Sequence, residues 1–360
     1  MRLILVFAFS CLAAVQALAQ EPQALDFEAL NRSLTERVTV PAYERLAAAT
    51  ARLDEATRGF CDEPTEARLR VAEAAFHETM DAWQWAQPIA FGPVAEAGRA
   101  ARIQFWPDKG GTASRQIKRA LAARDPALIA AGGLVGKSAG LQNLAAYERI
   151  LFGRGAAIAS GQDPYACSLA AAIARFQAAL AADILADWTA PGGHREAVLT
   201  AAQGNAHYAD AEEAATQYLK SLSGTLDLIV RLKLERPLGK TVEKARPRRA
   251  ESWRSARSLR NIIANLETAQ TLYIAPGGFG DLLTAAGVEP LDIGLRTGID
   301  AALDLARSID VPFHEAIADP EARVKLLDLL NRLKSLRLLI SGPLAEEIGL
   351  VVGFNALDGD

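Results

Sequence analysis

The chain of 360 residues carries 39 Lys and Arg against 43 Asp and Glu, which gives a net charge of −4 at pH 7. This balance argues against nucleic acid as a partner, because the neutralisation of phosphates requires a basic surface. Aromatic residues make up only 6% of the chain, alanine and leucine are abundant, and alternating β-branched runs are nearly absent. The composition therefore predicts an all-α protein.

The first residues have the features of an export signal. Arg2 supplies a positive start, residues 3–15 are apolar, and Ala17-Leu18-Ala19 has the small-residue pattern of a cleavage site. We expect residues 1–19 to be a signal peptide and the mature protein to lie in the periplasm or outside the cell. A lipid anchor at Cys11 is the alternative. No later stretch is expected to span a bilayer.

The remaining 341 residues (360 less 19) exceed one ordinary domain and suggest two. Pro191-Gly192-Gly193 is the clearest break, so we expect an N-terminal helical bundle over residues 20–190 and a C-terminal one over 191–360. Each half offers about four helices with mostly short connectors, which predicts two antiparallel bundles and an ancient duplication. The longer predicted helices cover residues 26–40, 41–60, 64–87, 164–188, 207–234, 251–274, 291–308 and 320–340, and a further one begins at Ser138.

Two cysteines, Cys61 and Cys167, remain after removal of the signal peptide. In an oxidising compartment an even pair predicts a disulfide. Such a bond would close a loop of about a hundred residues and add up to ~4–5 kcal/mol in the chain-entropy model. The alternative is two buried thiols.

The predicted helix over residues 64–87 carries Glu73, His77 and Asp81 at spacings i, i+4 and i+8. These side chains share one helix face, so they could converge on a divalent cation or Fe³⁺, with a carboxylate from a neighbouring helix completing the site. The alternative is an exposed polar face with helix-stabilising ion pairs, for which Arg70 is a partner.

Glu148 stands where a helix should have an apolar residue. At 3.6 residues per turn it falls among apolar positions, which are Leu141, Leu144, Ala145, Leu151 and Phe152. A buried carboxylate needs an arginine or lysine, a metal, a hydrogen-bond cluster or a proton, because desolvating it alone costs several kcal/mol. This residue therefore predicts the position of a site and leaves its partner open.

The predicted helix over residues 251–274 displays Arg254, Arg257, Asn261 and Asn265 along one side. This stripe could bind an anion or carboxylate, and it could equally be the solvated side of a surface helix. No His-Glu-x-x-His, Gly-x-Ser-x-Gly or phosphate-binding glycine loop is present, so no enzyme chemistry is visible.

Six short landmarks occur along the chain: Ala82-Trp83, Phe91-Gly92-Pro93, Phe105-Trp106-Pro107-Asp108, Gly140-Leu141-Gln142, Tyr147-Glu148-Arg149-Ile150-Leu151-Phe152 and Glu251-Ser252-Trp253-Arg254-Ser255. Together they resemble the imelysin-like family of exported bacterial proteins. The resemblance covers nearly the whole mature chain. It implies an all-helical fold of two related bundles, a link to bacterial iron uptake, and peptidase activity that is doubtful for most members.

The family hallmark is a Gly-x-His-x-x-Glu motif, proposed as a metal site near the domain interface. Anchored on Glu148, its glycine falls on Asn143 and its histidine on Ala145, so only the glutamate remains. Either His77 or Asp81 supplies the missing ligand from another helix, or Glu148 pairs with an arginine. Arg102 and Arg254 are the candidates for such a pair.

We therefore expect a periplasmic binding protein that assists the uptake of iron or another metal. Its pocket would lie between the two bundles, with Glu148, Trp106, Asp108, Arg254 and Arg102 as ligand-binding residues, and with Glu148, His77 and Asp81 as metal ligands. The alternatives are a metallopeptidase with a metal-bound water, and a metal-free module that docks an outer-membrane receptor or a periplasmic redox partner.

Overall fold

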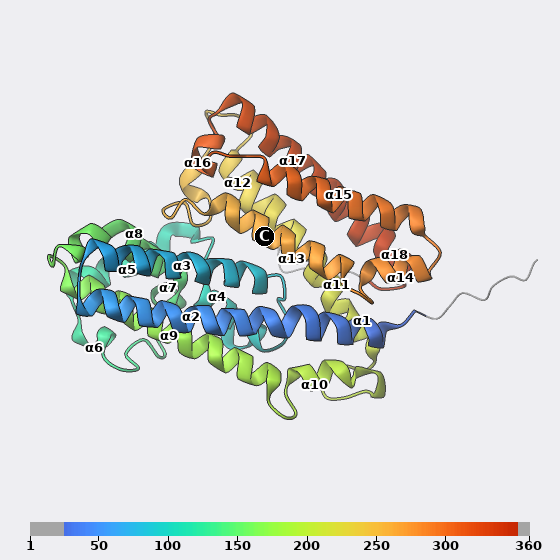
Figure 1. The fold of residues 1–360 in the computed structure, drawn as a ribbon, viewed down its shortest axis with the longest axis horizontal. Helices are drawn as coiled ribbons and strands as arrows, with labels where there is room; N and C mark the ends of the chain where they lie inside the picture. The colour runs from blue at the N-terminus through green and yellow to red at the C-terminus, as the bar shows by residue number, and fades with distance from the viewer. Residues whose placement is uncertain (1–24, 352–360) are drawn as a thin grey trace, which may run out of the picture.

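The computed structural model describes residues 25–351, and all regular secondary structure in this range is helical (Figure 1). The all-α prediction is confirmed. The predicted signal peptide and Cys11 lie outside the described residues. The elements up to residue 190 are α1 (Phe27–Leu34), η1 (Thr35–Thr39), α2 (Val40–Asp62), α3 (Glu66–Ala86), η2 (Gly92–Gly98), α4 (Arg99–Ile103), η3 (Lys109–Gly111), α5 (Thr112–Ala123), α6 (Pro126–Ile129), α7 (Ala139–Gln142), α8 (Leu144–Ala159) and α9 (Pro164–Thr189).

Thirteen further elements follow in the described part of the chain. They are α10 (His194–Leu199), η4 (Ala201–Gln203), α11 (Ala211–Asp227), η5 (Leu228–Glu235), α12 (Arg236–Leu238), η6 (Pro247–Arg249), α13 (Ser258–Ile274), α14 (Phe279–Ala285), α15 (Glu289–Arg307), α16 (Phe313–Ala316), α17 (Pro320–Leu339), η7 (Ile340–Leu344) and α18 (Ala345–Glu347).

Long antiparallel helices form the body of the molecule. Helix α2 packs along α3 and α9, and α8 lies against both α9 and α3. Helices α11, α13, α15 and α17 pack on one another, and α13 also packs on α3 (Figure 1). The contact between α3 and α13 joins segments from the two predicted halves.

Helix α1 belongs to the first predicted half but packs on helices of the second. Helix α1 packs on α11, Asn31 donates a hydrogen bond to the carbonyl of Ala211 (2.9 Å), and the hydroxyls of Thr35 and Tyr218 lie 2.7 Å apart. The N-terminal helix is therefore part of the packing of the second half. The division at residues 190 and 191, and the duplication, stay predictions.

Helix α9 is the longest helix of the first predicted half and lies in its core. The segment Pro164–Leu199 contains an 18-residue window with a mean hydropathy of 1.5, so it is long and apolar enough to cross a membrane by length and composition, which was not expected from the sequence. Half of this window is buried, and α9 packs on α2 and α8. This packing is that of a core helix.

The predicted disulfide is confirmed. Cys61, at the end of α2, is bonded to Cys167, in the first turns of α9. The bond ties together two helices that also pack along each other. It spans 106 residues of sequence, so most of its effect falls on the entropy of the unfolded chain.

Three predicted helix boundaries are wrong. The helix expected from Ser138 is interrupted at Asn143, whose extended backbone starts α8. The helix expected from residue 207 begins at Ala211, because Asp210 caps it through the backbone N–H of Glu213 (2.8 Å). The helix expected from residue 251 begins only at Ser258. Residues 251–257 form turns instead, and this difference decides the shape of the site.

A buried ion pair lies where the two predicted halves meet. Lys233 on η5 and Glu251 are each 1% exposed in their side chains, and Lys233 Nζ lies 2.8 Å from Glu251 Oε2. The ammonium also donates to Gln84 Oε1 (2.5 Å) and Asn265 Oδ1 (2.5 Å). Asn261 Nδ2 donates to Glu251 Oε2 (2.9 Å). Each charge thus has several partners, as buried charges require.

We predict that Lys233→Met destabilises the protein by about 3–5 kcal/mol, because it leaves the Glu251 carboxylate buried without its counter-charge. The double variant Lys233→Met/Glu251→Gln recovers part of this loss, since no charge is then left unpaired. Urea unfolding followed by circular dichroism measures both. Equal stability of the single variant and the wild type would contradict the prediction.

His194 is buried at the start of α10, 9% exposed, against Trp188 and Phe91. Its Nε2 lies 2.8 Å from the Tyr208 hydroxyl. Burial, with a smaller effect of His207, lowers the pKa of His194 from 6.5 to about 4. The folded state therefore keeps this imidazole neutral over a range in which the unfolded chain takes up a proton.

The contribution of His194 to the free energy of unfolding is fully present above pH 6.5 and is lost as the pH falls towards about 4. We predict that the gap in melting temperature between the wild type and His194→Gln narrows over this window. Thermal melts at intervals between pH 7.5 and 4.5 test it. A gap that is constant across the range would contradict it.

Candidate functional site

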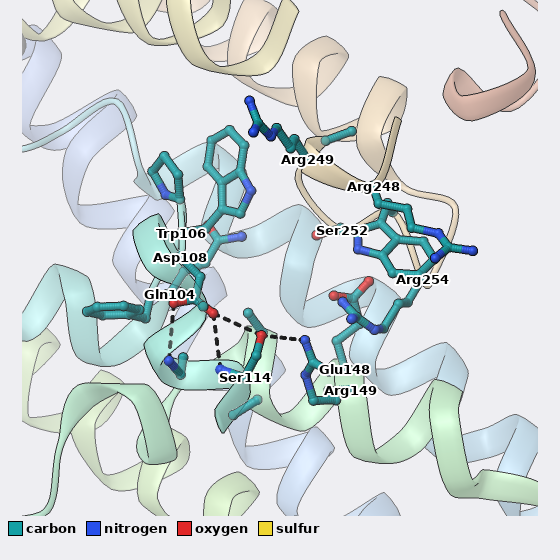
Figure 2. Close-up of a pocket in the computed structure, with 18 of the residues that line it drawn as sticks. Gln104, Trp106, Asp108, Ser114, Glu148, Arg149, Arg248, Arg249, Ser252 and Arg254 are labelled. Atoms are coloured by element: carbon teal, nitrogen blue, oxygen red, sulfur yellow. Dashed lines mark hydrogen bonds between the residues drawn. The ribbon is translucent and has the colours of Figure 1, made fainter. Parts of the chain in front are cut away.

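A cavity of about 400 Å³ opens between segments from both predicted halves. Its walls come from three stretches: residues 104–117, residues 145–149 of α8, and residues between 236 and 254 (Figure 2). Its aromatic side chains are Phe105, Trp106 and Trp253. A concave site with apolar walls and a few converging polar groups is the usual form of a ligand pocket.

Asn143 determines where Glu148 points. Its side chain accepts hydrogen bonds from the backbone N–H groups of Ala145 (2.8 Å) and Ala146 (3.1 Å), which starts α8 anew after the short α7. Glu148 then lies in the second turn of α8 and lines the cavity, although it is only 3% exposed. The predicted burial of this carboxylate is confirmed.

The hydrogen-bonding partner of Glu148 is Ser255. The backbone N–H (2.9 Å) and the hydroxyl (2.8 Å) of Ser255 both donate to Glu148 Oε1. Burial raises the pKa of Glu148, and the two Ser255 donors and the charge of Arg254 oppose this rise. Glu148 and Arg254 lie side by side in Figure 2. The carboxylate therefore joins α8 to the turn that precedes α13.

Five arginines line the cavity with only two carboxylates, Asp108 and Glu148. The arginines are Arg149, Arg236, Arg248, Arg249 and Arg254. Within the described part of the chain, none of the five forms an ion pair with a carboxylate. Burial and the charges of Arg149 and Arg248 lower the pKa of Arg254, and burial and Arg249 lower that of Arg236. These positive charges repel one another.

The turn over residues 251–257 holds three of the lining residues in place, Ser252, Trp253 and Arg254. Ser252 and Ala256 have positive φ, 48° and 56°, which costs on the order of 1–3 kcal/mol each for residues other than glycine. The Glu251 ion pair with Lys233 and the hydrogen bond from the Arg257 N–H to the Ser252 carbonyl (3.1 Å) maintain this shape. The turn presents Trp253 with Arg254 over its ring at 4.3 Å.

The Asp108 carboxylate accepts hydrogen bonds from the N-terminus of α5. It accepts from the backbone N–H groups of Ala113 (3.1 Å) and Ser114 (3.0 Å) and from the Ser114 hydroxyl (2.9 Å). Burial would raise the pKa of Asp108, but these hydrogen bonds outweigh it and lower the pKa. Arg149 Nη2 donates to the Ser114 hydroxyl (2.5 Å), so Asp108 orients Arg149 through Ser114 (Figure 2).

The structure brings together four of the predicted ligand-binding residues: Trp106, Asp108, Glu148 and Arg254 line the cavity. Arg102 does not. It donates to Gln142 Oε1 (3.3 Å) and to the Ala97 carbonyl. Of the two arginines expected to pair with Glu148, Arg254 is therefore the one whose charge acts on it.

The other predicted metal ligands lie apart from the cavity lining. Asp81 pairs with Arg257 and with Arg260 (3.1 Å), and the His77 ring packs on Phe152, with its Nδ1 buried and without a hydrogen bond. Asn261 and Asn265, expected on the same stripe as Arg254, belong to the buried network of Lys233.

The cavity residues do not fit a bare metal ion. Ala145 faces the cavity where the family motif has histidine, and Glu148 Oε1 already accepts two hydrogen bonds. Among residues 25–351, no three His, Cys, Asp or Glu side chains gather where they could hold a metal. Five arginines would also repel a cation. We therefore derive no metal chemistry from this site.

The site residues that were not predicted are Arg149, Arg236, Arg248, Arg249 and Ser255. Arg149 follows Glu148 directly, and consecutive residues of a helix do not share a face. Arg248 and Arg249 belong to a basic stretch, residues 240–250, in which no helical pattern marks a face. The available signal was that this basic stretch ends next to Glu251-Ser252-Trp253, one of the family landmarks.

These features define an all-α protein with an arginine-lined pocket between its helices. The family model for imelysin matches residues 39–340, and the chain belongs to the imelysin family. An imelysin-like protein from Psychrobacter arcticum 273-4 has a similar fold, with a TM-score of 0.76 and 19% identity over 92% of this chain and 99% of that one.

Two further proteins are similar to this chain. A putative iron-regulated protein A precursor from Parabacteroides distasonis has a TM-score of 0.75 and 17% identity, over 90% of this chain and 96% of that one. Iron-regulated protein A from Synechococcus elongatus is 30% identical over 87 residues, which are 24% of each chain. The match therefore spans about a quarter of that relative.

We predict that Asp108→Ala lowers the free energy of unfolding by about 1 kcal/mol, because the N–H groups that begin α5 lose their acceptor. Asp108→Asn costs less, since its amide oxygen still accepts hydrogen bonds. Chemical unfolding of the three proteins measures the order. An alanine variant as stable as the wild type would mean that water replaces the carboxylate fully.

Proposed function

We propose that this protein is an exported binding protein that assists iron uptake by capturing an anionic ligand in the arginine-lined pocket. The observation that carries the proposal is the excess of three positive charges on the cavity lining. Iron would then enter as a negatively charged chelate, and the protein would contact the chelator and not the bare ion.

The charge distribution supports a site for anions. The chain as a whole is negative, at −4, so the positive lining is a local feature. Guanidinium groups bind carboxylates and phosphates with two parallel hydrogen bonds. An anion among Arg149, Arg248 and Arg254 would relieve their mutual repulsion, and a positive cleft attracts such ligands from a distance.

The names of related proteins support export and a link to iron. Two relatives carry the name iron-regulated protein A, and one of them is described as a precursor. Together with the export signal expected in residues 1–19, this favours a periplasmic protein. Delivery of the ligand to an outer-membrane receptor or a periplasmic redox component remains part of the proposal.

Isothermal titration of the mature protein with citrate, ferric citrate and Zn²⁺ tests the proposal. We predict that both anions bind, that NaCl weakens their binding, and that Zn²⁺ alone does not bind. Arg254→Ala should weaken citrate binding at least tenfold, about 1.4 kcal/mol. Quenching of Trp106 and Trp253 fluorescence provides a second readout in the pocket.

Arg246→Ala is the matched control. Arg246 is exposed in the same basic stretch, contacts the carbonyls of Glu243 and Ala245, and does not line the cavity. It should leave citrate affinity unchanged. Equal losses in the two arginine variants would assign binding to the general surface charge. Tight Zn²⁺ binding that depends on Glu148 would favour the metal site expected from the family motif.

A further inference from the structure

The two carboxylates of the pocket differ in their hydrogen bonds, because both oxygens of Asp108 accept from the start of α5, whereas those of Glu148 are not both used. Both Ser255 hydrogen bonds go to Oε1 of Glu148. Within the described residues no protein group donates to Oε2. This oxygen is also not one of the fully buried polar atoms without a hydrogen bond, so it retains some exposed surface. Because Glu148 lines the cavity, Oε2 is the atom that remains for a ligand.

This acceptor has a consequence for selectivity. A ligand that presents only anionic groups is attracted by the arginines and repelled by Glu148 where it approaches Oε2. A ligand that also carries a hydroxyl next to its anionic group suits both the arginines and Glu148. The arginines bind the anionic group, and the hydroxyl donates a hydrogen bond to Oε2. Hydrogen bonds to a charged acceptor are among the stronger ones.

The arrangement of the arginines indicates more than one anionic group. They come from α8, from α12 and from the stretch before α13, and they surround a cavity of about 400 Å³. Arg149 is fixed by Ser114, and Arg254 is fixed over Trp253. A single small anion cannot reach all sides, whereas planar carboxylates on a short carbon chain match several guanidinium planes.

Resting on the proposed function, we propose that the pocket selects hydroxy-polycarboxylates and that Glu148 is the specificity-determining residue, accepting a hydrogen bond from the ligand hydroxyl. Ser255 fixes the carboxylate by occupying Oε1, which aims Oε2 into the cavity. Ligands of this class also chelate Fe³⁺ through the hydroxyl oxygen, and a coordinated alkoxide has no proton to donate, so this selection applies to the free acid and to chelates that leave a hydroxyl uncoordinated.

The test compares pairs of acids that differ in one hydroxyl. Citrate and tricarballylate, and malate and succinate, are titrated into the mature protein at constant pH and ionic strength. We expect the hydroxylated member of each pair to bind at least about tenfold more tightly, because its analogue leaves Oε2 unpaired. In Glu148→Ala this ratio should fall to about one, with tricarballylate binding more tightly than to the wild type.

Two further variants complete the test. Glu148→Gln keeps an acceptor for Ser255 and controls for loss of the fold, which melting curves check directly. Its amide removes the repulsion, so tricarballylate should again gain affinity. Glu243→Gln removes an exposed carboxylate from the same basic stretch outside the cavity and should leave both the ratio and the affinities unchanged.

The outcomes separate the two proposals. Equal binding of citrate and tricarballylate, lost in Arg254→Ala, would overturn the hydroxyl selection and keep the anion site. A ratio that persists in Glu148→Ala would overturn the role of Glu148. No binding by any of the four acids would overturn both. Glycerol 3-phosphate binding more tightly than citrate would assign the site to hydroxylated phosphates.

Discussion

The buried ion pair of Lys233 and Glu251 is the constraint on which the site depends. Lys233 comes from η5, and its ammonium donates to Gln84 of α3 and to Asn265 of α13. Glu251 is the first residue of the turn that ends at α13. An ion pair this deeply buried contributes little net stability compared with apolar packing, but it fixes one geometry, because any other leaves a charge without partners.

What this geometry fixes is the turn over residues 251–257. Its two residues with positive φ, Ser252 and Ala256, are strained, and a helix over this stretch would relieve the strain. The helix would also point Trp253 and Arg254 along its own surface and take Ser255 away from Glu148. The strained turn instead places Trp253 and Arg254 at the cavity and Ser255 against Glu148. The strain thus serves the site, and the turn keeps its shape because any other arrangement would leave the buried Lys233 or Glu251 without its partners.

Sequence alone could predict much of the fold and part of the site. Glu148 was found because a carboxylate on an apolar face contradicts the helical period, and the disulfide followed from an even count of cysteines. The turn before α13 was missed, because helical periodicity continues through residues 251–257 and only tertiary partners override it. Asn261 and Asn265 illustrate the same limit: their spacing defines a face, but whether that face meets water or Lys233 depends on α3 and η5.

The exchange at Ala145 gives the pocket a different chemistry from that of the family motif. A histidine there would stand beside Glu148 and offer a second metal ligand. Alanine removes this ligand. The other carboxylate, Asp108, is taken up by the start of α5, which leaves Glu148 among the arginines of the cavity. Such a carboxylate cannot be retained for attracting anions, since it weakens the field of the arginines. It is fixed by Ser255 and reachable from the cavity, so its contribution is to discriminate among anions by the hydrogen bonds that they can donate.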